Sequence, residues 1–561
     1  MNDNKLRLLW LDLNASFAHA SLALPAIHAQ TLNREWCDQV EWTVLPATLH
    51  MPVTNIVNEI VEKNPDIIAA TAWLFTTEML RAVLIRVHAL LPECKIILGG
   101  PEFLGDNEAY LRANPYVFSL FRGEGEEILP QWIEQMLKAG KNAGKSTLSS
   151  ITGACYLNED GVYADQGHAK VARFAELTAP EDSEFFRTDK AFVQLETTRG
   201  CFNTCAFCVS GNDRPVRRIS IEEIKRRLEF YAAAGITHIR LLDRTFNANS
   251  RLAHEMLDLF ESYAGKLCFH LEIHPALLGD QLRERMALLP EGLLHLEAGI
   301  QSLRQNVLNA SKRLGSLEDS LEGLAYLCSL NNMEVHADLI AGLPLYTLSQ
   351  LKEDVQTLAS LKAGEIQLEL LKILPGTEMH QRAAELGLIY SLLPPYEVLA
   401  SDGMTPADLQ ESKRLSRMID MYYNAPVWQS FMQRIIPEDS RFMQVFVDWL
   451  TEKGVLDSPL SMEKRGLLLF TFISEYDKEY LPAVAVSWLK GGLPVKKIPF
   501  RVFEPVNSEE LAQAKSIEGE ADSETRYYAV RDGKNQNRIT YIGFNPQTGS
   551  SMPVYMGEYE G

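Results

Sequence analysis

The sequence predicts an α/β protein with a doubly wound N-terminal domain, a central partial (β/α)6 barrel and a mixed, mostly helical C-terminal domain. Short apolar runs alternate with amphipathic segments of helix length through residues 5–138, and the same alternation resumes near residue 192. Nearly continuous apolar strands are typical of parallel sheets that helices cover on both faces. The length of 561 residues fits roughly three to four domains.

The N-terminal region contains five segments with the composition of buried strands. They are Leu6–Leu13, Val40–Leu45, Ile67–Thr71, Lys95–Leu98 and Val117–Phe121. The helices expected around them are Leu22–Arg34, Val53–Lys63, Thr76–Leu90 and Glu126–Lys138. This pattern predicts a parallel sheet within a domain over residues 1–140.

Parallel sheets bind ligands at the carboxyl ends of their strands, so we expect a ligand at this edge. The candidate residues there are Thr71, Trp73, Gly99, Gly100, Pro101, Glu102, Gly123 and Glu124. Paired glycines after a strand allow a ligand to approach the backbone closely. A plain tight turn explains each of these segments as well. Trp73 and Phe75 could contact a ligand, although aromatic residues at a strand end more often belong to the core.

Residues 141–187 are expected to be a linker with a small β element around Asn158–Gly161. Six strand-like runs then define a barrel domain over residues 188–385. They are Phe192–Glu196, His238–Asp243, Leu267–Ile273, Leu293–Ile300, Val335–Leu343 and Ile366–Leu374. Helices are expected between them, with Ser220, Ser316 and Thr347 as N-caps.

The remaining residues, 386–561, predict a domain of different character. Helices are expected over Met404–Tyr423, Trp428–Ile435 and Arg441–Lys453. Strands are expected over Val495–Phe503, Tyr527–Arg531 and Asn537–Phe544. The acidic segment Glu509–Glu524 is expected to be a solvated or mobile loop.

The composition excludes several classes of protein. An apolar fraction of 46% with 23% charged residues is ordinary for a globular protein and excludes disordered and collagen-like classes. A net charge of −20 argues against a nucleic-acid-coating surface. Eight cysteines are too few for a disulfide scaffold, which indicates a reducing compartment. No segment reaches the ~18 apolar residues of a membrane span, so a cytoplasmic protein is expected.

Three of the cysteines lie within eight residues and are the strongest chemical signal in the sequence. Cys201, Cys205 and Cys208 have the spacing C-x3-C-x2-C directly after the first barrel strand. Three thiolates on one loop can bind three irons of a cubane cluster and leave the fourth iron open. Structural zinc is the alternative, but it requires four ligands, and His168 and His238 are at least 30 residues away.

This motif resembles that of the radical S-adenosylmethionine (SAM) enzymes, in which an aromatic residue, here Phe207, precedes the third cysteine. Further motifs that match in order are Asp243–Asn247, Leu296–Ser302, Asp338–Pro344 and Leu374–Thr377. The resemblance implies a 4Fe-4S cluster bound by the three cysteines. It also implies that SAM is bound by Phe207, Asp243, Glu297, Gln301 and Asp338. Structural hydrogen bonding within the barrel is the alternative for the four polar residues, which lie in or after apolar strands.

The N-terminal domain resembles the cobalamin-binding domain of cobalamin-dependent radical SAM enzymes, through Gly99–Glu102 and Arg122–Glu126. None of its histidines fits the Asp-x-His-x-x-Gly motif that holds cobalt in many cobalamin domains. The resemblance therefore implies cobalamin without a histidine ligand from that motif. The alternative is loss of cobalamin, as in the related methylthiotransferases, whose N-terminal domain carries a second three-cysteine cluster. Here Cys37, Cys94 and Cys155 are isolated from one another in the sequence.

The function implied by the resemblance is cleavage of SAM to a 5′-deoxyadenosyl radical, followed by cobalamin-dependent methylation of an unactivated carbon. A cobalamin-dependent rearrangement or cyclisation, as in tetrapyrrole cyclases, is one alternative. An iron–sulfur protein that binds SAM for electron transfer or sensing is another. The expected partners are a small-molecule substrate and a reductant such as flavodoxin or ferredoxin. A nucleic-acid partner is not expected.

The basic stretch after the cysteines has two interpretations. It contains Arg214, Arg217, Arg218, Lys225, Arg226 and Arg227. These side chains could bind a substrate carboxylate or phosphate. A solvated helix face beside Glu222 and Glu223 is the favoured interpretation. The sequence does not indicate which substrate enters the barrel.

Overall fold

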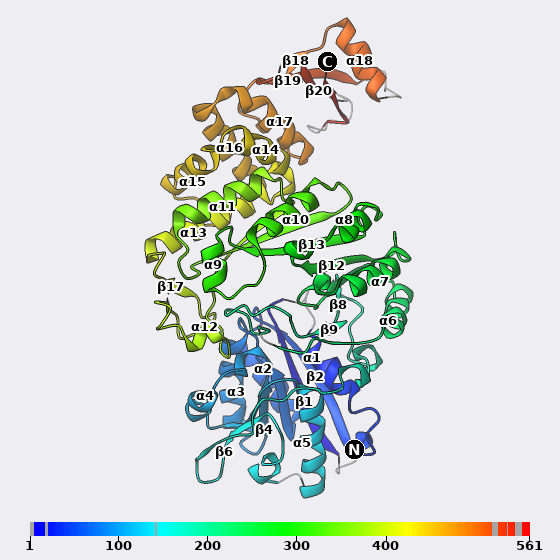
Figure 1. Cartoon of the computed structure of the whole chain (residues 1–561), viewed down its shortest axis with the longest axis vertical. Helices are drawn as coiled ribbons and strands as arrows, with labels where there is room; N and C mark the ends of the chain where they lie inside the picture. Colours follow the sequence, from blue (N-terminus) through cyan, green and yellow to red (C-terminus); the bar gives the residue numbers. More distant parts are fainter. Residues whose placement is uncertain are drawn as a thin grey trace. The chain divides into compact units, whose positions relative to one another are not determined.

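The computed structural model describes residues 5–16, 21–140, 143–211, 213–518, 525–535, 537–544 and 553–560 (Figure 1). The chain divides into two compact units. The first contains residues 1–335, 342–346 and 370–406. The second contains residues 336–341, 347–369 and 407–561.

The N-terminal part of the first unit is a seven-stranded sheet with the order β2-β1-β3-β4-β5-β6-β7. Its first five strands are parallel: β1 (Leu6–Asn14), β2 (Val40–Thr48), β3 (Ile67–Thr71), β4 (Lys95–Gly99) and β5 (Val117–Phe121). They confirm the five predicted strands. The hairpin β6 (Ala154–Leu157) and β7 (Tyr163–Asp165) is the small β element expected in the linker, and it extends this sheet in the antiparallel sense.

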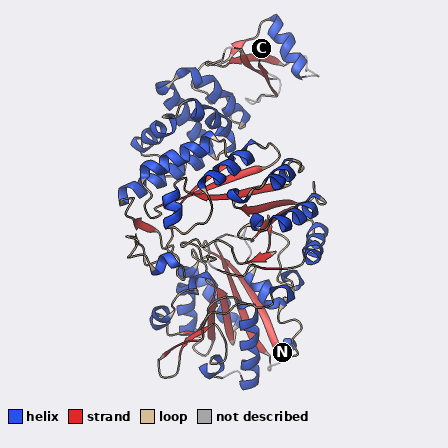
Figure 2. Cartoon of the chain, in the orientation of Figure 1, coloured by secondary structure: helices blue, strands red, loops and turns tan. Residues whose placement is uncertain are grey.

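Helices cover both faces of this sheet, as expected for a doubly wound fold (Figure 2). They are α1 (Ala23–Ala29), α2 (Val53–Lys63), α3 (Thr77–Leu90), α4 (Glu108–Ala113) and α5 (Gly125–Ala139). Ile56 and Leu80 belong to one apolar core, while Leu24 and Trp132 belong to a second core. The short helix α4 was not predicted, since six residues are too few for a clear apolar periodicity.

The barrel domain contributes four parallel strands to the first unit, in the order β13-β12-β11-β8. They are β8 (Val193–Leu195), β11 (His238–Leu241), β12 (Cys268–Ile273) and β13 (Leu294–Gln301). The connecting helices are α6 (Ile221–Ala233), α7 (Ser250–Glu261), α8 (Asp280–Ala287), α9 (Gln305–Ala310) and α10 (Leu317–Ser329). Ser220 and Ser316 accept the backbone N–H bonds expected of N-caps.

Two short hairpins complete the first unit. The strands β9 (Thr198–Arg199) and β10 (Arg217–Arg218) pair in the antiparallel sense and enclose the cysteine-bearing connection. After helix α12 (Glu378–Gln381), strands β16 (Ile389–Tyr390) and β17 (Val398–Ala400) form the second hairpin.

The second unit holds the last two strands of the six-stranded barrel sheet, β14 (Glu334–Ala341, from His336 onward) and β15 (Glu365–Leu370). Between them, α11 (Leu348–Ser360) begins with a complete capping box from Thr347 and Gln350. All six predicted barrel strands are therefore present. A helical region follows, with α13 (Pro406–Met418), a π-helical turn (Ile419–Tyr423), α14 (Pro426–Glu438), α15 (Phe442–Glu452), α16 (Met462–Tyr476) and α17 (Leu481–Lys490).

Two expectations for the C-terminal region are wrong. Residues 495–497 form a 3-10 helix, and the strand β18 is only Glu504–Pro505. Residues 508–518 form helix α18, whereas a solvated loop was predicted there. Alanines and glutamates have high helix propensity, which the charge pattern alone does not reveal. Residues 519–524 lie outside the described residues.

The chain ends in a four-stranded antiparallel sheet of β18, β19 (Arg526–Arg531), β20 (Arg538–Phe544) and β21 (Tyr555–Glu560). Strands β19 and β20 confirm two predicted strands. Within the described part of the chain, no helix combines the length and apolar character that crossing a membrane requires.

Candidate functional site

The three cysteines lie in the connection between β9 and β10, and two glycines determine its path. Gly200 has a φ of 103°, and a Cβ there would lie 2.5 Å from the carbonyl oxygen of Asp213. The next residue, Cys201, donates its N–H to that same oxygen at 3.0 Å. A Cβ on Gly211 would lie 2.5 Å from the carbonyl oxygen of Cys205. No other residue fits at either position without moving the backbone.

The sulfur atoms of this loop receive hydrogen bonds from the backbone. Asn203 N–H donates to Cys201 Sγ and Ser210 N–H donates to Cys208 Sγ, each at 3.4 Å. Burial raises the pKa of the Cys205 thiol, and negative charge on the other two cysteines raises it further. The thiols are thus close enough to interact electrostatically. Three such sulfurs, with N–H donors directed at two of them, fit an iron–sulfur cluster.

Arg313, which the sequence analysis did not identify, approaches the third sulfur. Its Nη1 donates to Cys205 Sγ at 3.5 Å, and its other terminal nitrogen donates to the carbonyl oxygen of Gly299. The positive charge of Arg313 opposes the rise in the pKa of Cys205 that burial causes. A cation at this distance stabilises thiolate charge on the loop.

The segment around Arg313 also anchors the cysteine loop. Leu314 N–H donates to Asn203 Oδ1 at 3.0 Å, and Thr204 Oγ1 donates to the carbonyl oxygen of Lys312 at 2.7 Å. Ala206 N–H donates to the carbonyl oxygen of Ser311 at 2.9 Å. The connection after β13 is therefore hydrogen-bonded to the cysteine loop and holds it in place.

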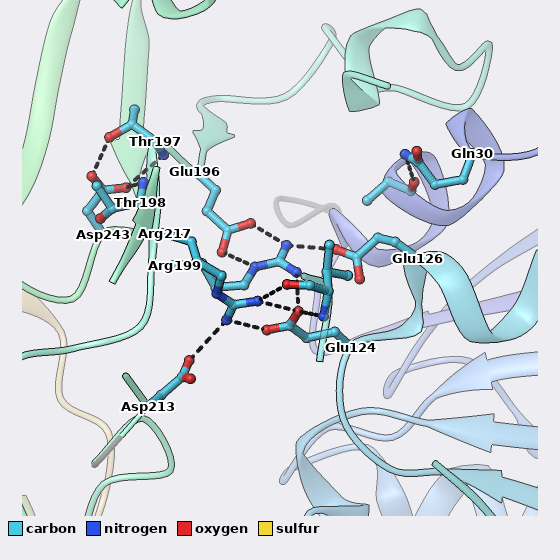
Figure 3. A network of polar contacts seen from close by, with 12 residues as sticks. Gln30, Glu124, Glu126, Glu196, Thr197, Thr198, Arg199, Asp213, Arg217 and Asp243 are labelled. Carbon is cyan, nitrogen blue, oxygen red and sulfur yellow. Dashed lines mark hydrogen bonds and ion pairs between the residues drawn. The ribbon is translucent and has the colours of Figure 1, made fainter. Parts of the chain in front are cut away.

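Asp243, a predicted SAM ligand, binds the strand that leads into the cysteine loop. Its Oδ1 accepts the N–H groups of Thr197 at 2.8 Å and Thr198 at 2.9 Å, and its Oδ2 accepts the Thr197 hydroxyl (Figure 3). Burial raises the pKa of Asp243, and these hydrogen bonds oppose the rise. The carboxylate thus positions the start of the loop, and its contact with SAM stays a prediction.

Glu297 and Gln301, two more predicted SAM ligands, lie on β13. Glu297 bonds to His270 at 2.8 Å and to Arg240 at 3.0 Å, and the hydrogen bond from His270 is the largest cause that lowers the pKa of Glu297. A Cβ on Gly299 would lie only 2.6 Å from the side-chain amide nitrogen of Gln301. Glu297 is held by neighbouring strands, as the structural alternative expects, while SAM binding by either residue stays a prediction.

For the remaining two predicted SAM ligands, Phe207 and Asp338, the structure gives their burial and their element. Phe207 is half-buried within the cysteine loop. Asp338 is half-buried on β14, in the part of that strand that belongs to the second unit. Their roles stay predictions.

The N-terminal sheet has an apolar cavity of about 170 Å³ at the carboxyl ends of its strands. Six of the eight predicted cobalamin-binding residues line it, namely Thr71, Trp73, Gly99, Gly100, Pro101 and Gly123. Its volume is below the ~300 Å³ at which ligand pockets usually begin. The cavity therefore fits an apolar portion of cobalamin, and the rest of that cofactor would lie outside it.

Gly100 and Gly123 shape this cavity by close backbone approach. A Cβ on Gly100 would lie 2.7 Å from the Ala72 carbonyl oxygen, and one on Gly123 would lie 2.2 Å from the Ala169 carbonyl oxygen. Trp73 and Phe75 are 38% and 59% exposed, so their interpretation as core residues is wrong.

The two predicted carboxylates of this edge, Glu102 and Glu124, do not line the cavity. Glu102 accepts the hydroxyl of Tyr396, from the β16–β17 hairpin. Glu124 accepts Arg217 Nη2 at 2.6 Å and Nη1 at 2.8 Å, and it lies 3.4 Å from Arg199 (Figure 3). Burial alone would raise the pKa of Glu124, but the two arginines and a backbone N–H lower it below its usual range.

The basic stretch after the cysteines is not a solvated face throughout. Arg217 binds Glu124, and Arg227 is 4% exposed and donates to Glu181 at 2.7 Å. Arg226 pairs with Glu223 at 2.7 Å on the outer side of α6, as expected for an exposed helix face. The favoured interpretation is therefore wrong for Arg217 and Arg227, which pair with acidic residues of preceding segments.

His274, at the end of β12, was also missed. It is 4% exposed, bonds through Nε2 to the Leu314 carbonyl oxygen at 2.9 Å, and lies edge-on to Phe202. Burial and then Arg313 lower its pKa to about 4, so the ring is neutral at pH 7. A single histidine after a strand carries no signal in the sequence that would have found it.

Family models match three parts of the chain. The "B12 binding domain" matches residues 16–133, the "Radical SAM superfamily" matches residues 195–358, and "Protein of unknown function (DUF4080)" matches residues 384–487. The first two matches cover the sheet with the apolar cavity and the barrel with the cysteine loop.

Curated relatives match part of the chain. The cobalamin-dependent radical SAM methyltransferase TokK of Streptomyces tokunonensis is 22% identical over 359 residues, covering 60% of this chain and 50% of that protein. The tRNA-2-methylthio-N(6)-dimethylallyladenosine synthase of Acinetobacter baumannii (strain AYE) is 24% identical over 299 residues, covering 51% and 58%. The chain thus spans about half the length of the curated relatives it matches.

Solved structures share the fold. The cobalamin-dependent SAM radical enzyme OxsB with aqua-cobalamin bound has a TM-score of 0.59 at 16% identity, covering 87% of this chain and 82% of that one. The radical SAM methyltransferase TsrM from Kitasatospora setae, with cobalamin and a [4Fe-4S] cluster, has a TM-score of 0.54 at 16% identity, covering 73% and 81%.

The domain matches support the three expected cofactors, a 4Fe-4S cluster, SAM and cobalamin. They agree with the donor atoms of the cysteine loop and with the apolar cavity of the N-terminal sheet. The chain therefore combines matches to a B12-binding domain, a radical SAM domain and a C-terminal DUF4080 region, and in the first two it is similar to cobalamin-dependent radical SAM enzymes.

Proposed function

We propose that this protein methylates an unactivated carbon of a small-molecule substrate by cobalamin-dependent radical SAM chemistry. One observation carries the proposal. The cysteine loop, at the carboxyl ends of barrel strands, is joined by ion pairs to the domain with the apolar cavity. The similarity to TokK, a cobalamin-dependent radical SAM methyltransferase, supports the proposal.

The residues of this chain have separate tasks in the proposal. Cys201, Cys205 and Cys208 hold the cluster, and Asp243 holds the strand that leads to them. Arg313 presents a guanidinium beside Cys205, where it suits the carboxylate of SAM. When bound, the cofactors supply one-electron cleavage of SAM to a 5′-deoxyadenosyl radical and a methyl group for transfer. The apolar walls of the barrel would keep water from the reacting carbon.

The experiment is anaerobic turnover of protein reconstituted with iron, sulfide and hydroxocobalamin, in the presence of SAM and a strong reductant. Methylation predicts both S-adenosylhomocysteine and 5′-deoxyadenosine. Deoxyadenosine without S-adenosylhomocysteine would reject methylation and support a rearrangement or cyclisation. Absence of both products would support an electron-transfer or sensor role. Absence of corrin absorbance after reconstitution would support a cobalamin-free enzyme.

The proposal extends to partners and domain limits. A flavodoxin or ferredoxin would supply the electron, and the net charge of −20 disfavours a nucleic-acid substrate. The domains would be 1–140 for cobalamin, 141–187 as the linker, 188–385 for the barrel and 386–561 as the C-terminal domain. Limited proteolysis followed by mass spectrometry tests these limits, because exposed boundaries are cleaved first.

A further inference from the structure

Two arginines face each other at the base of the cysteine loop. Arg199 and Arg217 are directly paired across the β9–β10 hairpin, and the chain between them carries all three cysteines. Like charges directly opposite one another destabilise a strand pair. The hairpin that closes the loop therefore requires negative charge close by, part of which Asp213 and Glu196 supply from the same segment.

Glu124 of the N-terminal domain supplies charge to both arginines. Its Oε1 lies 2.6 Å from Arg217 Nη2, and its Oε2 lies 3.4 Å from Arg199 Nη1 (Figure 3). Arg199 is further held by Glu126 at 2.7 Å and by Glu196 at 2.7 Å. Glu124 is thus the residue of this group that bridges both strands of the hairpin.

These ion pairs are partly buried, so their stability depends on all of the partners being in place. The side chains of Arg217, Arg199 and Glu124 are only 10%, 16% and 16% exposed. Salt screens partly buried pairs much less than surface pairs. Removing one partner of such a pair leaves the other charge without compensation in a poorly solvated site.

The same turn of the chain faces the apolar cavity of the N-terminal sheet. Gly123 and Gly125, the neighbours of Glu124 on either side, both line that cavity. The turn has little freedom, since Gly123 packs against the Ala169 backbone and Val171 N–H donates to Glu124 at 2.6 Å. A ligand against Gly123 and Gly125 would therefore act directly on the turn that holds Glu124 against the two arginines.

We propose that Glu124 is a positioning residue through which cobalamin in the N-terminal domain stabilises the cysteine loop and the cluster it holds. The inference rests on the proposed function only in that it takes both cofactors to bind. It needs no transfer of atoms or electrons between them. Coupling of two binding equilibria is reciprocal, so the cluster must strengthen cobalamin binding by the factor by which cobalamin strengthens cluster binding.

The first test uses the wild-type protein alone. Hydroxocobalamin is titrated anaerobically into cluster-free and cluster-reconstituted protein, and its affinity is measured from the visible spectrum. We expect the reconstituted protein to bind it at least ~5-fold more tightly, the lower end of typical coupling between sites. Saturating hydroxocobalamin should also slow the release of cluster iron to a chelator.

The second test compares Glu124→Gln with Glu134→Gln. The first substitution removes the charge that the arginines share and leaves a side chain of similar size. The second makes the same change within helix α5, which Glu124 precedes. The Glu134 carboxylate is partly exposed, pairs with Lys138 at 2.5 Å and, in the described structure, contacts neither arginine of the hairpin. Glu124→Gln should bind hydroxocobalamin with equal affinity in both cluster states, whereas Glu134→Gln should retain the wild-type difference.

Each outcome decides the matter. Equal affinities in the two cluster states of the wild-type protein would overturn the inference, even if Glu124→Gln does not fold. Full coupling in Glu124→Gln would overturn it as well. Binding of both cofactors without coupling would leave the proposed function intact. Failure of the wild-type protein to bind hydroxocobalamin at all would overturn the cobalamin-dependent function and this inference together.

Discussion

The guanidinium of Arg313 lies 3.5 Å from the sulfur of Cys205, although the two residues are 108 positions apart in the chain. The contact places a positive charge beside one of the three expected cluster ligands. Charge and hydrogen bonds at the ligating sulfurs are main determinants of the potential of an iron–sulfur cluster.

Replacing Arg313 with methionine should make the cluster harder to reduce. Loss of the cation destabilises the more negative reduced state, and we expect the midpoint potential to fall by on the order of 50 mV. The measurement is a redox titration followed by electron paramagnetic resonance without SAM. Arg313→Lys keeps the charge and should retain most of the wild-type potential. An unchanged potential in Arg313→Met would contradict the proposed electrostatic role.

Replacing Asp243 with alanine should loosen the cysteine loop. The substitution leaves the buried N–H groups of Thr197 and Thr198 without their acceptor, and we expect a loss of about 3 kcal/mol in the free energy of unfolding. Iron content after reconstitution and thermal unfolding are the measurements. Thr197→Val removes only the hydroxyl contact and should cost about 1 kcal/mol. Normal iron content in Asp243→Ala would show that the loop does not depend on this carboxylate.

Replacing Gly211 with alanine should impair the cluster for steric reasons. The new Cβ would lie 2.5 Å from the Cys205 carbonyl oxygen and 3.1 Å from that of Cys208, so both cysteines must move. We expect iron content and SAM cleavage to fall severalfold. Gly279→Ala is the control, because nothing lies within 4 Å of a Cβ there. Equal iron content in the two variants would disprove the steric argument.

Replacing Ala69 with leucine should block the N-terminal cavity. Ala69 lines the cavity of about 170 Å³ and is 2% exposed, so added carbons enter that space. We expect hydroxocobalamin binding to weaken at least ~10-fold, equivalent to about 1.4 kcal/mol. Equilibrium dialysis gives the affinity, while iron content and melting temperature should stay near wild-type values. Unchanged affinity would place the cofactor elsewhere.

His274 predicts a pH dependence of stability. Its pKa is lowered from 6.5 to about 4, so the folded protein keeps the ring neutral while the unfolded chain takes up a proton below pH 6.5. This stability is complete above pH 6.5 and is lost as the pH falls toward 4. Between pH 7 and pH 5 the loss should be about 2 kcal/mol.

The measurement for His274 is thermal unfolding of the cluster-free protein at pH 7 and pH 5. His274→Gln retains a donor for the Leu314 carbonyl oxygen and removes the titration. Its melting temperature should therefore fall less between the two pH values than that of the wild-type protein. The same fall in both proteins would assign the pH dependence to other groups.

Local patterns in the sequence were sufficient for much of the fold. The strand Ile67–Thr71 and the helix Val53–Lys63 have the predicted bounds, because burial and amphipathicity repeat over a few residues. The three cysteines lie within eight residues, so their chemistry is readable without the fold. The prediction of a strand over Val495–Phe503 failed because residues 495–497 turn into a 3-10 helix and Pro499 lacks the N–H that a strand donates to its neighbour.

The tertiary structure decided which partner each charged residue has. Glu124 and Arg217 are 93 positions apart, and Glu102 and Tyr396 are 294 apart, so no local pattern connects them. Both glutamates were predicted to bind cobalamin, since they follow strands at the ligand-binding edge. In the structure they bind residues of the barrel domain and the hairpin after it. The sequence by itself was sufficient to locate the segments expected to bind cofactors, because each is a short contiguous motif. Only the folded chain decided how they are joined, because ion pairs depend on distances in space.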